Sequence, residues 1–527
     1  MALAADVSQL PEFRNEPLTD FSRPENRRRF TAGLAEARGE LGRQCENRIG
    51  ADPSHHGSRS GEKFRSINPS RPGEVVGVHQ QNTAAAARDA ITAAALMFES
   101  WRFSDPRQRV QILLRAAELL RQRKPYYSAW LTLEVGKTFP EADADVAETI
   151  DFLEYYSRQQ LRLSAPQPLP QLAGEHGELV YIPLGVGAVI PPWNFPMAIT
   201  AGMTAAAIVT GNTVVLKPSS DAPTVAVKFI EVLEQAGLPA GVVNLVTGAG
   251  GTVGEALIND PRTRFIAFTG SKAVGLDIHR QAAVPQPGQR WIKRTILEMG
   301  GKDSILVDAD ADLEAAVEGV AVSAFGYQGQ KCSACSRAIV HEKVYDRFVE
   351  ALTARTRQMR VGDAADPGNA LGPVINQRAL DNTLNYIEIG KREGRLTTGG
   401  EVSSKDGFFL PPTIFADVAP TARLAQEEIF APVLAVIRCR DFDEGLAIAN
   451  NTEYGLTGAV YSRDPEKLQQ AAHKFHVGNL YFNRKCTGAM VGAHPFGGFN
   501  LSGTDSKAGG PDYLLLFTQA KSIARRL

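Results

Sequence analysis

The stretch that decides the fold runs from residue 213 to residue 248: TVVLKPSSDAPTVAVKFIEVLEQAGLPAGVVNLVTG. The apolar run Thr213–Leu216 predicts a buried strand. Pro223–Gln235 repeats apolar residues at helical spacing and is closed by Gly237, which predicts a helix, and Val242–Val246 predicts a second strand. Short buried strands joined by single helices are typical of a parallel, doubly wound sheet.

The same alternation continues on both sides of this stretch. Upstream, Gly185–Val215 is the most apolar part of the chain, and its prolines and turn residues divide it into strand, loop, helix and strand. Downstream, helices and strands alternate at Gly250–Asn259, Phe265–Phe268, Ser271–Gln281 and Thr295–Leu297. The sequence therefore predicts an α/β fold.

Polar residues and glycines follow four of the predicted strands. They are Lys217, Gly248–Gly251, Thr269–Ser271 and Glu298. Ligands of doubly wound sheets bind outside the carboxyl ends of the strands, so these residues predict a site for a phosphate-bearing ligand. With Gly254, the glycines form G-x-G-x-x-x-G, one residue longer than the dinucleotide fingerprint, and alone they indicate a plain tight turn as readily.

The rest of the chain divides into three parts. Helical spacing recurs over Thr83–Arg123 and Pro140–Arg162. After Asp308, a helix at Leu313–Phe325, a strand at Ala338–Val340, a helix at Tyr345–Met359 and further elements to about Tyr461 predict a second α/β domain. The first 60 residues are polar and weakly periodic, and their Gly/Ser/His-rich end, Ala51–Gly61, predicts an arm or linker. The run Arg27–Arg29 is interpreted as a solvated helical face.

Composition excludes several classes of protein. The 527 residues include 57 Lys and Arg against 58 Asp and Glu, a net charge of −1, so we expect no attraction to nucleic acid or to an anionic membrane. Five cysteines are too few for a disulfide framework and fit a reducing compartment. The acidic first thirty residues lack an apolar run of seven, and no window is long and apolar enough to span a membrane. We expect a cytoplasmic protein.

Cys332 and Cys335 form a C-x-x-C motif with several interpretations. A zinc site would need a second ligand pair, which the sequence lacks, and no metal site is predicted. A redox pair and a single reactive thiolate both remain open, and Lys331 and the glycine-flanked loop before Cys332 favour the thiolate. A pair of inert buried cysteines is the alternative that base rates favour.

Two other residues add to the chemistry of this thiol. Glu298 follows a strand and precedes Gly300–Gly301, where a carboxylate can approach a ligand without a side-chain wall. Asn194 is pinned between prolines in Pro192–Pro196, and a rigid amide is a good oxyanion donor. Nucleophile, general base and oxyanion donor together predict covalent acyl chemistry.

At this point the sequence resembles a known family. From Ser70 to the C-terminus the chain is similar to aldehyde dehydrogenases. The shared motifs, in the family's order, are Phe-Thr-Gly-Ser at 268–271, Leu-Glu-Met-Gly-Gly at 297–301, Gly-Gln-Lys-Cys at 329–332 and Glu-Glu-Ile-Phe-Ala-Pro-Val at 427–433. The 34 residues from Glu298 to Cys332 also fit the family pattern.

The resemblance implies the aldehyde dehydrogenase fold: a Rossmann-like cofactor domain, an α/β catalytic domain and a small β bridging element. We expect an N-terminal arm (1–60), a dinucleotide-binding domain (61–163 and 182–300) and a catalytic domain (301–490). Residues 164–181 and 491–527 would form the bridging, oligomerising element and a C-terminal substrate-anchor loop. A homo-oligomer, a dimer or an assembly of dimers, is implied.

The resemblance also implies roles for individual residues. Cys332 would attack the aldehyde, Asn194 and the Cys332 backbone N–H would hold the oxyanion, and Glu298 would activate water to hydrolyse the thioester. Lys217 would hold the adenosine ribose, Ser271 the pyrophosphate, and Glu428 with Phe430 the nicotinamide riboside. The implied NAD-binding residues are Trp193, Lys217, Ser219, Ser220, Gly250, Gly251, Phe268, Thr269, Gly270, Ser271, Val274, Gly300, Glu428 and Phe430.

One position departs from the pattern of strictly NAD-dependent members. These often carry a glutamate three residues after the lysine, where it repels a 2′-phosphate, and here that position is Ser220. We expect NAD to be used and NADP to be tolerated.

Within the family, the C-terminal half most resembles 1-pyrroline-5-carboxylate (glutamate 5-semialdehyde) dehydrogenases, on residues 477–485, 495–504 and 507–513. The expected reaction is NAD(P)-dependent oxidation of L-glutamate 5-semialdehyde to L-glutamate in proline catabolism. By this resemblance, bare N–H groups of Gly509 and Gly510 and the Ser333 hydroxyl would bind the substrate carboxylate. Glu148 would pair with its ammonium, and Phe517 would pack on its methylenes.

Two other functions remain open. The first alternative is another semialdehyde dehydrogenase or a CoA-acylating member of the family. A CoA-acylating enzyme does not need to activate water, so the presence of Glu298 counts against it. A non-catalytic structural or redox-sensing member acting through Cys332 and Cys335 is the other, and the intact Cys332, Glu298 and Asn194 count against it.

Overall fold

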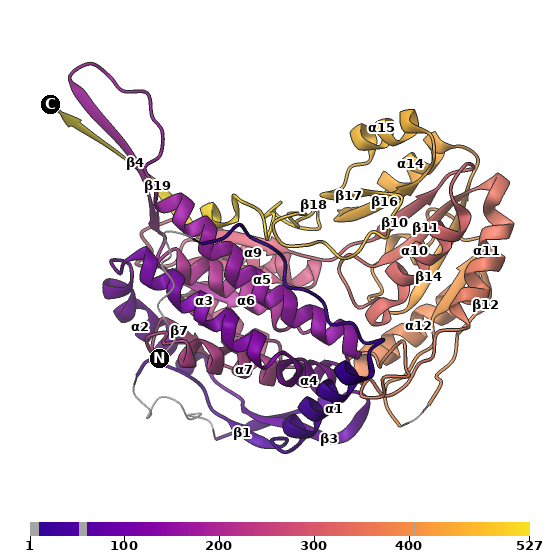
Figure 1. Cartoon of the computed structure of the whole chain (residues 1–527), viewed down its shortest axis with the longest axis horizontal. Coiled ribbons are helices and arrows are strands. Elements are labelled where there is room, and N and C mark those ends of the chain that lie inside the picture. The colour runs from indigo at the N-terminus through magenta and orange to yellow at the C-terminus, as the bar shows by residue number, and fades with distance from the viewer. Residues whose placement is uncertain (1–9, 52–60, 405) are drawn as a thin grey trace.

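The computed structural model describes residues 10–51, 61–404 and 406–527 (Figure 1). Its first large sheet has five parallel strands in the order β7-β6-β5-β8-β9. They are β5 (Val186–Ile190), β6 (Thr213–Leu216), β7 (Val243–Leu245), β8 (Thr263–Thr269) and β9 (Arg294–Glu298). From β5 the chain first builds one side of the sheet with β6 and β7, and then returns to build the other side with β8 and β9. The direction of the strand order therefore reverses between β5 and β8. Such a switch point is where doubly wound sheets bind ligands.

Helices cover both faces of this sheet because its strands bury alternate residues on opposite sides. Val215 and Ile266 pack toward one layer, and Val214 and Ala267 pack toward the other. The first layer holds α2 (Ala84–Trp101), η3 (Gly250–Gly254), α8 (Glu255–Asn259) and α9 (Lys272–Ala282). The second holds α3 (Pro106–Gln122), α4 (Lys124–Val135), α5 (Phe139–Ser164), α6 (Ala198–Val209) and α7 (Pro223–Gln235). The predicted parallel, doubly wound sheet is confirmed.

The second large sheet has seven strands in the order β12-β13-β14-β11-β10-β16-β17, and only the edge strand β12 is antiparallel. The strands are β10 (Asp303–Val307), β11 (Cys335–His341), β12 (Arg395–Thr398), β13 (Thr413–Ala416), β14 (Val433–Cys439), β16 (Thr457–Tyr461) and β17 (Asn479–Phe482). One face packs on α10 (Leu313–Phe325) and α11 (Glu342–Thr356). The other packs on α12 (Gln377–Glu393), α13 (Arg423–Gln426), α14 (Phe442–Asn450) and α15 (Pro465–Lys474). The predicted second α/β unit is confirmed.

The N-terminal region is more ordered than an arm. Helix α1 (Pro24–Arg38) packs against α4, and Phe30 and Leu34 are buried at helical spacing. Strand β1 (Arg43–Cys45) pairs with β3 (Arg71–Gln80), which also pairs with β2 (Lys63–Asn68). Residues 24–45 therefore differ from the arm expected over residues 1–60, because three buried apolar residues, Phe30, Leu34 and Ala37, anchor a helix that is otherwise polar. Arg28 and Arg29 are exposed on α1, as expected, and residues 52–60 of the predicted linker lie outside the described residues.

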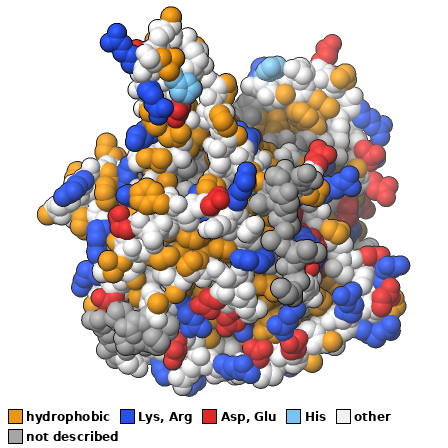
Figure 2. Space-filling model, turned by 60° about the vertical axis from the view of Figure 1, so that its left-hand side comes forward, with side chains coloured by type: hydrophobic (Ala, Val, Ile, Leu, Met, Phe, Trp, Pro, Cys, Tyr) orange, Lys and Arg blue, Asp and Glu red, His pale blue; other side chains and the backbone are white. Residues whose placement is uncertain are grey.

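A two-stranded ribbon stands away from the body of the molecule (Figure 1). It pairs β4 (Glu175–Pro183) with the C-terminal strand β19 (Thr518–Arg526), antiparallel over nine residue pairs. The segment between the second sheet and β19 contains β18 (Phe499–Asn500), which pairs with β15 (Tyr454–Gly455), and the short helix η5 (Tyr513–Phe517). Figure 2 shows Lys and Arg dispersed among Asp and Glu over the face it presents. Within the described ranges, every helix is too short or too polar to span a bilayer.

Candidate active site

Cys332 lies in the turn between α10 and β11, and its side chain is partly exposed. The turn begins with η4 (Gly326–Gly329), in which Tyr327 and Gln328 adopt left-handed backbone angles, with φ of 51° and 55°. Two contacts of Tyr327 fix this conformation: its N–H donates to Glu141 Oε1 at 2.6 Å, and its hydroxyl donates to the Val135 carbonyl at 2.8 Å. The thiol therefore sits on a backbone held by α4 and α5 of the first unit.

Asn194 points at the same turn from the end of β5. Its side chain is buried, and Nδ2 donates to the Gln330 carbonyl at 3.1 Å, two residues before Cys332. A primary amide has two N–H groups, so one remains to donate to an oxygen formed beside the thiol. The structure thus brings together the two residues that sequence analysis assigned to nucleophile and oxyanion donor.

Glu298 is the last residue of β9 and enters the site from the opposite side. Its Oε1 accepts a hydrogen bond from the Ser506 hydroxyl, while Oε2 is buried and has no partner among the described residues. Burial raises the pKa of this carboxyl to about 8. Residues 502–506 hold it in place, since Thr504 N–H donates to the Leu297 carbonyl at 3.0 Å and Met299 N–H to the Ser502 carbonyl at 2.7 Å. Sequence analysis missed Ser506, which lies about 200 residues from Glu298.

The electrostatics around the thiol differ from the expectation. Burial raises the pKa of Cys332, and the carboxyl groups of Asp303, Glu298 and Glu428 raise it further. Lys331 does not offset these effects, although we expected it to favour a thiolate. Its own pKa is lowered, first by burial. Because burial and three acids raise its pKa, the resting Cys332 side chain is a neutral thiol, which must lose its proton before it can act as a nucleophile.

The cofactor side begins at the end of β6, where Lys217 is buried beside η3. Its Nζ donates to the Pro218 carbonyl at 3.1 Å, which leaves further N–H groups for a ligand, and burial lowers its pKa to about 8. Gly250 and Gly251 are exposed, with open space where a side chain would project, so a ligand can approach their backbone. In the turn after Lys217, Ser219 Oγ accepts from the Asp221 N–H at 3.3 Å and Ser220 is exposed.

The end of β8 lies on the other side of the switch point from β6. Phe268 is buried, and its ring fills the space where a side chain at Gly270 would lie, while Met299 fills that beside Gly275. Thr269 and Gly270 are partly exposed. Ser271 caps α9, its Oγ accepting from the Val274 N–H at 3.4 Å, and the exposed Val274 side chain forms an apolar surface on the first turn of the helix.

A third segment, residues 427–433, completes this side. Glu428 Oε1 accepts from the Gly301 N–H at 3.0 Å, and its carboxylate occupies the space beside Gly300, where a Cβ would lie 2.2 Å from it. Burial raises the pKa of Glu428 to about 7. Phe430 packs edge to face on Trp193, with ring centroids 5.6 Å apart. The structure therefore brings the predicted residues of β5, β9 and this segment to one place.

Comparison with known proteins gives this arrangement a family. The model of the aldehyde dehydrogenase family matches residues 56–523. The chain belongs to the aldehyde dehydrogenase family.

Three relatives extend the comparison. A 1-pyrroline-5-carboxylate dehydrogenase from Geobacillus kaustophilus is 56% identical over 512 residues, which cover 97% of this chain and 99% of the relative. The crystal structure of 1-pyrroline-5-carboxylate dehydrogenase from Thermus with bound NAD has a TM-score of 0.96 at 48% identity, covering 98% of this chain and 100% of that one. Proline utilization A (PutA) from Bdellovibrio bacteriovorus has a TM-score of 0.95 at 45% identity, covering 98% of this chain and 53% of that one.

In this aldehyde dehydrogenase, the predicted ammonium partner Glu148 lies on α5 and is partly exposed. Burial and, next, the charge of Asp145 raise its pKa to about 8 against the opposing effect of the cations of Lys137 and Lys331. Glu148 is thus within electrostatic reach of the residue that precedes the nucleophile. Ser333 is partly exposed on the other side of Cys332, and its backbone N–H bonds the thiol.

The C-terminal segment differs in one respect from the expectation. The backbone N–H groups of Gly509 and Gly510 are not bare: they donate at 2.9 Å to the Tyr156 hydroxyl and to the Lys507 carbonyl. The turn at Gly509 has a φ of 72°. Phe517 is fully buried and packs edge to face on Phe265 and Tyr513, and its contact with a substrate stays a prediction.

The dehydrogenase also has an aromatic residue that sequence analysis did not single out. Phe195, next to Asn194, is partly exposed, and Lys137 Nζ lies 3.7 Å from its ring centroid. The proline-flanked motif marked this position, but only the structure places the ring beside the oxyanion donor.

The two cysteines of the C-x-x-C motif do not act as a pair in this structure. The buried Cys335 thiol donates to the Arg337 carbonyl at 3.4 Å and hydrogen-bonds the Cys486 side chain. No disulfide joins any of the five cysteines. Over residues 10–51, 61–404 and 406–527, no cluster of three or more His, Cys, Asp or Glu could hold a metal ion.

Proposed function

We propose that this chain is an NAD-dependent dehydrogenase that oxidises L-glutamate 5-semialdehyde, in equilibrium with 1-pyrroline-5-carboxylate, to L-glutamate in proline catabolism. The observation that carries the substrate is the 56% identity to a 1-pyrroline-5-carboxylate dehydrogenase over 97% of the chain. The site supports it: the Asn194 amide bonds the turn that carries the Cys332 thiol, the buried Glu298 carboxyl acts electrostatically on that thiol, and the Glu148 carboxyl is within electrostatic reach of Lys331 beside it.

Cys332 is the proposed nucleophile. Its sulfur forms a bond to the aldehyde carbon as the thiol proton passes to solvent water, which reaches the partly exposed side chain, and the C=O π electrons move to the carbonyl oxygen, which takes the negative charge. The free N–H of Asn194 Nδ2 and the backbone N–H of Cys332 stabilise that oxygen. Because Asn194 is fixed to the Gln330 carbonyl, its donor is in place before the charge develops, which is the condition for efficient stabilisation.

Glu298 is the proposed general base. Its unpartnered Oε2 accepts a proton from water, which attacks the thioester carbon, breaks the C–S bond and releases the acid. A pKa of about 8 makes the carboxylate basic enough for this step and leaves a minor fraction ionised at pH 7. The Ser506 hydroxyl holds the other oxygen and so orients the carboxylate.

The residues around the switch point fit a dinucleotide. Lys217 has N–H groups to donate to ribose hydroxyls, Gly250 and Gly251 leave room for phosphate, and the α9 terminus provides unpaired N–H groups. Glu428 would accept from the second ribose, and Trp193 with Phe430 would enclose the nicotinamide side. When bound, NAD supplies the hydride acceptor. The exposed Ser220 has no carboxylate to repel a 2′-phosphate, which supports tolerance of NADP.

The substrate's amino-acid end is proposed to lie between Glu148 and Ser333. Glu148 would pair with the ammonium, and the Ser333 hydroxyl would donate to the carboxylate. Gly509 and Gly510 could donate as well only if their bonds to Tyr156 and Lys507 were exchanged for bonds to the substrate. Burying an alkyl aldehyde in this site would leave charged groups unpaired, which disfavours it.

We also propose the division into a dinucleotide-binding domain (61–163 and 182–300), a catalytic domain (301–490) and an oligomerising element (164–181 and 491–527). The β4–β19 ribbon supports the last, because among the described strands each of its two pairs with the other alone, and it stands clear of the body. A homo-oligomer and a cytoplasmic location complete the proposal. Five unpaired cysteines fit a reducing compartment.

A steady-state assay that follows NADH formation tests the substrate. Glutamate 5-semialdehyde is compared with propanal at saturating NAD, and we expect kcat/KM to be about 10⁴-fold higher for the semialdehyde, because a site built for polar groups rejects a substrate that lacks them. Equal or better turnover of propanal would refute the substrate assignment while leaving the aldehyde dehydrogenase chemistry intact.

A further inference from the structure

Residues 10–22, which we call the N-terminal strap, lie across α5 without forming a helix or strand. Two buried aspartates of α5 hold the strap along its length. Asp143 accepts from the Thr19 N–H at 2.9 Å and from its hydroxyl at 2.6 Å, and Asp151 Oδ1 accepts from the Glu16 N–H at 2.6 Å. The strap is therefore docked on the helix that carries Glu148.

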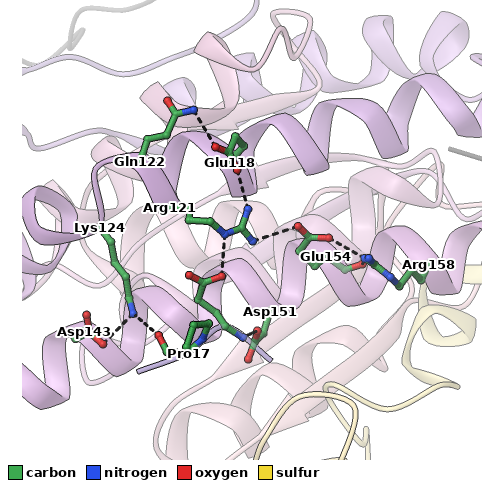
Figure 3. A network of polar contacts seen from close by, with 10 residues as sticks. Pro17, Glu118, Arg121, Gln122, Lys124, Asp143, Asp151, Glu154 and Arg158 are labelled. Atoms are coloured by element: carbon green, nitrogen blue, oxygen red, sulfur yellow. Dashed lines mark hydrogen bonds and ion pairs between the residues drawn. The ribbon is translucent and has the colours of Figure 1, made fainter. Parts of the chain in front are cut away.

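Two cations reinforce this contact (Figure 3). Lys124 donates to the Pro17 carbonyl at 3.0 Å and to Asp143 at 2.9 Å. Arg121 of α3 bonds Glu16 at 2.9 Å and Glu154 of α5 at 3.3 Å, so one guanidinium joins the strap to both helices. Charge-assisted bonds at partly buried positions fix the strap more firmly than neutral ones would.

Asn15 extends the contact beyond α5. Its Nδ2 donates to Asp151 Oδ2 at 2.8 Å and to the Val491 carbonyl at 3.0 Å, so both amide hydrogens are used. Asp151 is one helical turn from Glu148, while Val491 belongs to the segment that leads to Gly509. One side chain of the strap therefore joins the helix that carries Glu148 to a segment more than 300 residues further along the sequence.

The neighbouring aromatic ring supports the same junction. Phe13 packs edge to face on Tyr155 of α5, with centroids 5.1 Å apart. Both rings lie against Gly492, where a Cβ would come within 3.0 Å of Phe13 and 3.1 Å of Tyr155, and whose φ of 80° also favours glycine. The Gly492 N–H then donates to the Gly509 carbonyl at 2.8 Å. Contacts thus run without a break from Asn15 and Phe13 to the anchor loop.

We propose that the N-terminal strap determines specificity for the amino-acid end of the substrate, with Asn15 as a positioning residue. Glu148 and the Gly509 turn belong to α5 and to the C-terminal segment, so contacts between these two segments set the distance between them. Tyr156–Gly509 and Arg162–Pro511 bonds link these parts two to four helical turns beyond Glu148, and the Phe152 ring lies beside Gly509 one turn beyond it. Asn15 adds a hydrogen-bonded link at Asp151, also within one turn of Glu148. The proposal rests on the proposed function.

The test replaces Asn15 with leucine, which has a similar shape and no donors. We expect Asn15→Leu to raise KM for glutamate 5-semialdehyde about tenfold, because the ammonium and carboxylate sites lose their fixed spacing. Its kcat on the semialdehyde and its kcat/KM on propanal change less than about twofold, since Cys332, Glu298 and the cofactor side are untouched. Asn26→Ala is the control: Asn26 lies on α1 and donates to the Asp20 carbonyl at the end of the strap.

Equal losses on both aldehydes, or an unchanged KM for the semialdehyde, would overturn the proposal. If Asn15→Leu does not fold, as judged by thermal unfolding and NAD binding, Phe13→Leu replaces it. That variant loosens the support of Gly492 without leaving a buried acid unpaired, and it must raise the same KM. The wild-type enzyme separates the two hypotheses: if it does not prefer the semialdehyde over propanal, the proposed function fails, whatever Asn15 does.

Discussion

The cofactor side and the amino-acid side of this active site are assembled in different ways. On the cofactor side, most functional residues follow strands of one sheet, and the ends of β5, β6, β8 and β9 all lie within residues 190–298. On the amino-acid side, the residues come from the strap, α5, the Cys332 turn and the 491–510 segment. The cofactor side is thus built from consecutive strands and helices of one sheet. The amino-acid side depends on contacts between segments that are far apart in the sequence.

Two buried glutamates of the site differ in how their carboxylate oxygens are bonded. Glu428 is held by the Gly301 N–H beside the proposed ribose, and Glu298 is held by Ser506 but keeps one oxygen free. Burial raises the pKa of both, to about 7 and about 8. A bound carboxylate suits holding a ligand, and a carboxylate with a free buried oxygen suits moving a proton.

The largest effect is expected at the nucleophile, on which both sides depend. Cys332→Ala should lower kcat on every aldehyde by about 10⁴-fold or more, because no other group can form the covalent adduct. Cys335→Ala is the matched control, since that buried thiol contacts Arg337 and Cys486 and faces neither cofactor nor substrate. Turnover is measured by NADH formation. Substantial activity in Cys332→Ala would contradict covalent catalysis.

The next effect concerns the general base. Glu298→Gln should slow thioester hydrolysis by about 10²- to 10³-fold while leaving a stoichiometric burst of NADH, because the first half of the reaction does not need the base. Since the pKa of Glu298 is raised to about 8, its carboxylate forms as the pH rises, and the wild-type hydrolysis rate should rise through pH 8 and then level off. Rapid-mixing kinetics across pH measures both. A variant that keeps the rise near pH 8 would exclude Glu298 as its source.

A smaller effect is expected on the amino-acid side alone. Glu148→Gln should lower kcat/KM for glutamate 5-semialdehyde about 100-fold and leave propanal nearly unchanged, because the variant cannot neutralise a buried ammonium. The pKa of Glu148 is raised to about 8, so protonation below that pH should raise the wild-type KM for the semialdehyde as the pH falls. Loss of activity on both aldehydes would show that Glu148 serves the fold instead of the substrate.

The smallest effect is expected at the edge of the cofactor side. Ser220→Glu should lower kcat/KM for NADP about 30-fold by placing a carboxylate near the 2′-phosphate, and change that for NAD less than about threefold. Ser220→Gln is the control, with the same shape and no charge. If the wild type already prefers NAD more than a thousandfold, Ser220 does not permit NADP.

Several elements could be predicted from sequence because their signal is local. The bounds of β6, α7 and α10 agree with the predicted ones, since a buried strand or an amphipathic helix carries its own periodicity. Glycines and polar residues at strand ends marked the site of Lys217, Gly250 and Ser271. Helix α1 was missed because only a few buried residues interrupt its polar sequence.

The remaining errors concern contacts that no local pattern encodes. Whether the N–H of Gly509 is free depends on Tyr156, which lies 353 residues away. The protonation of Cys332 depends on acids from β9, β10 and the 427–433 segment, which outweigh the adjacent Lys331. The packing of Phe517 is likewise set by a distant residue, Phe265 in the sheet.

The sequence by itself determined the two α/β units and the order of their strands along the chain, and it predicted Cys332, Glu298 and Asn194 as nucleophile, base and oxyanion donor. These depend on periodicity and on residue chemistry, which are present in every short stretch. The tertiary structure decided that the thiol rests neutral among three acids, that the glycine turn is closed by Tyr156, and that Asn15 ties α5 to the C-terminal segment. Burial, charge and spacing are properties of neighbours in space, and those neighbours are hundreds of residues apart along the chain.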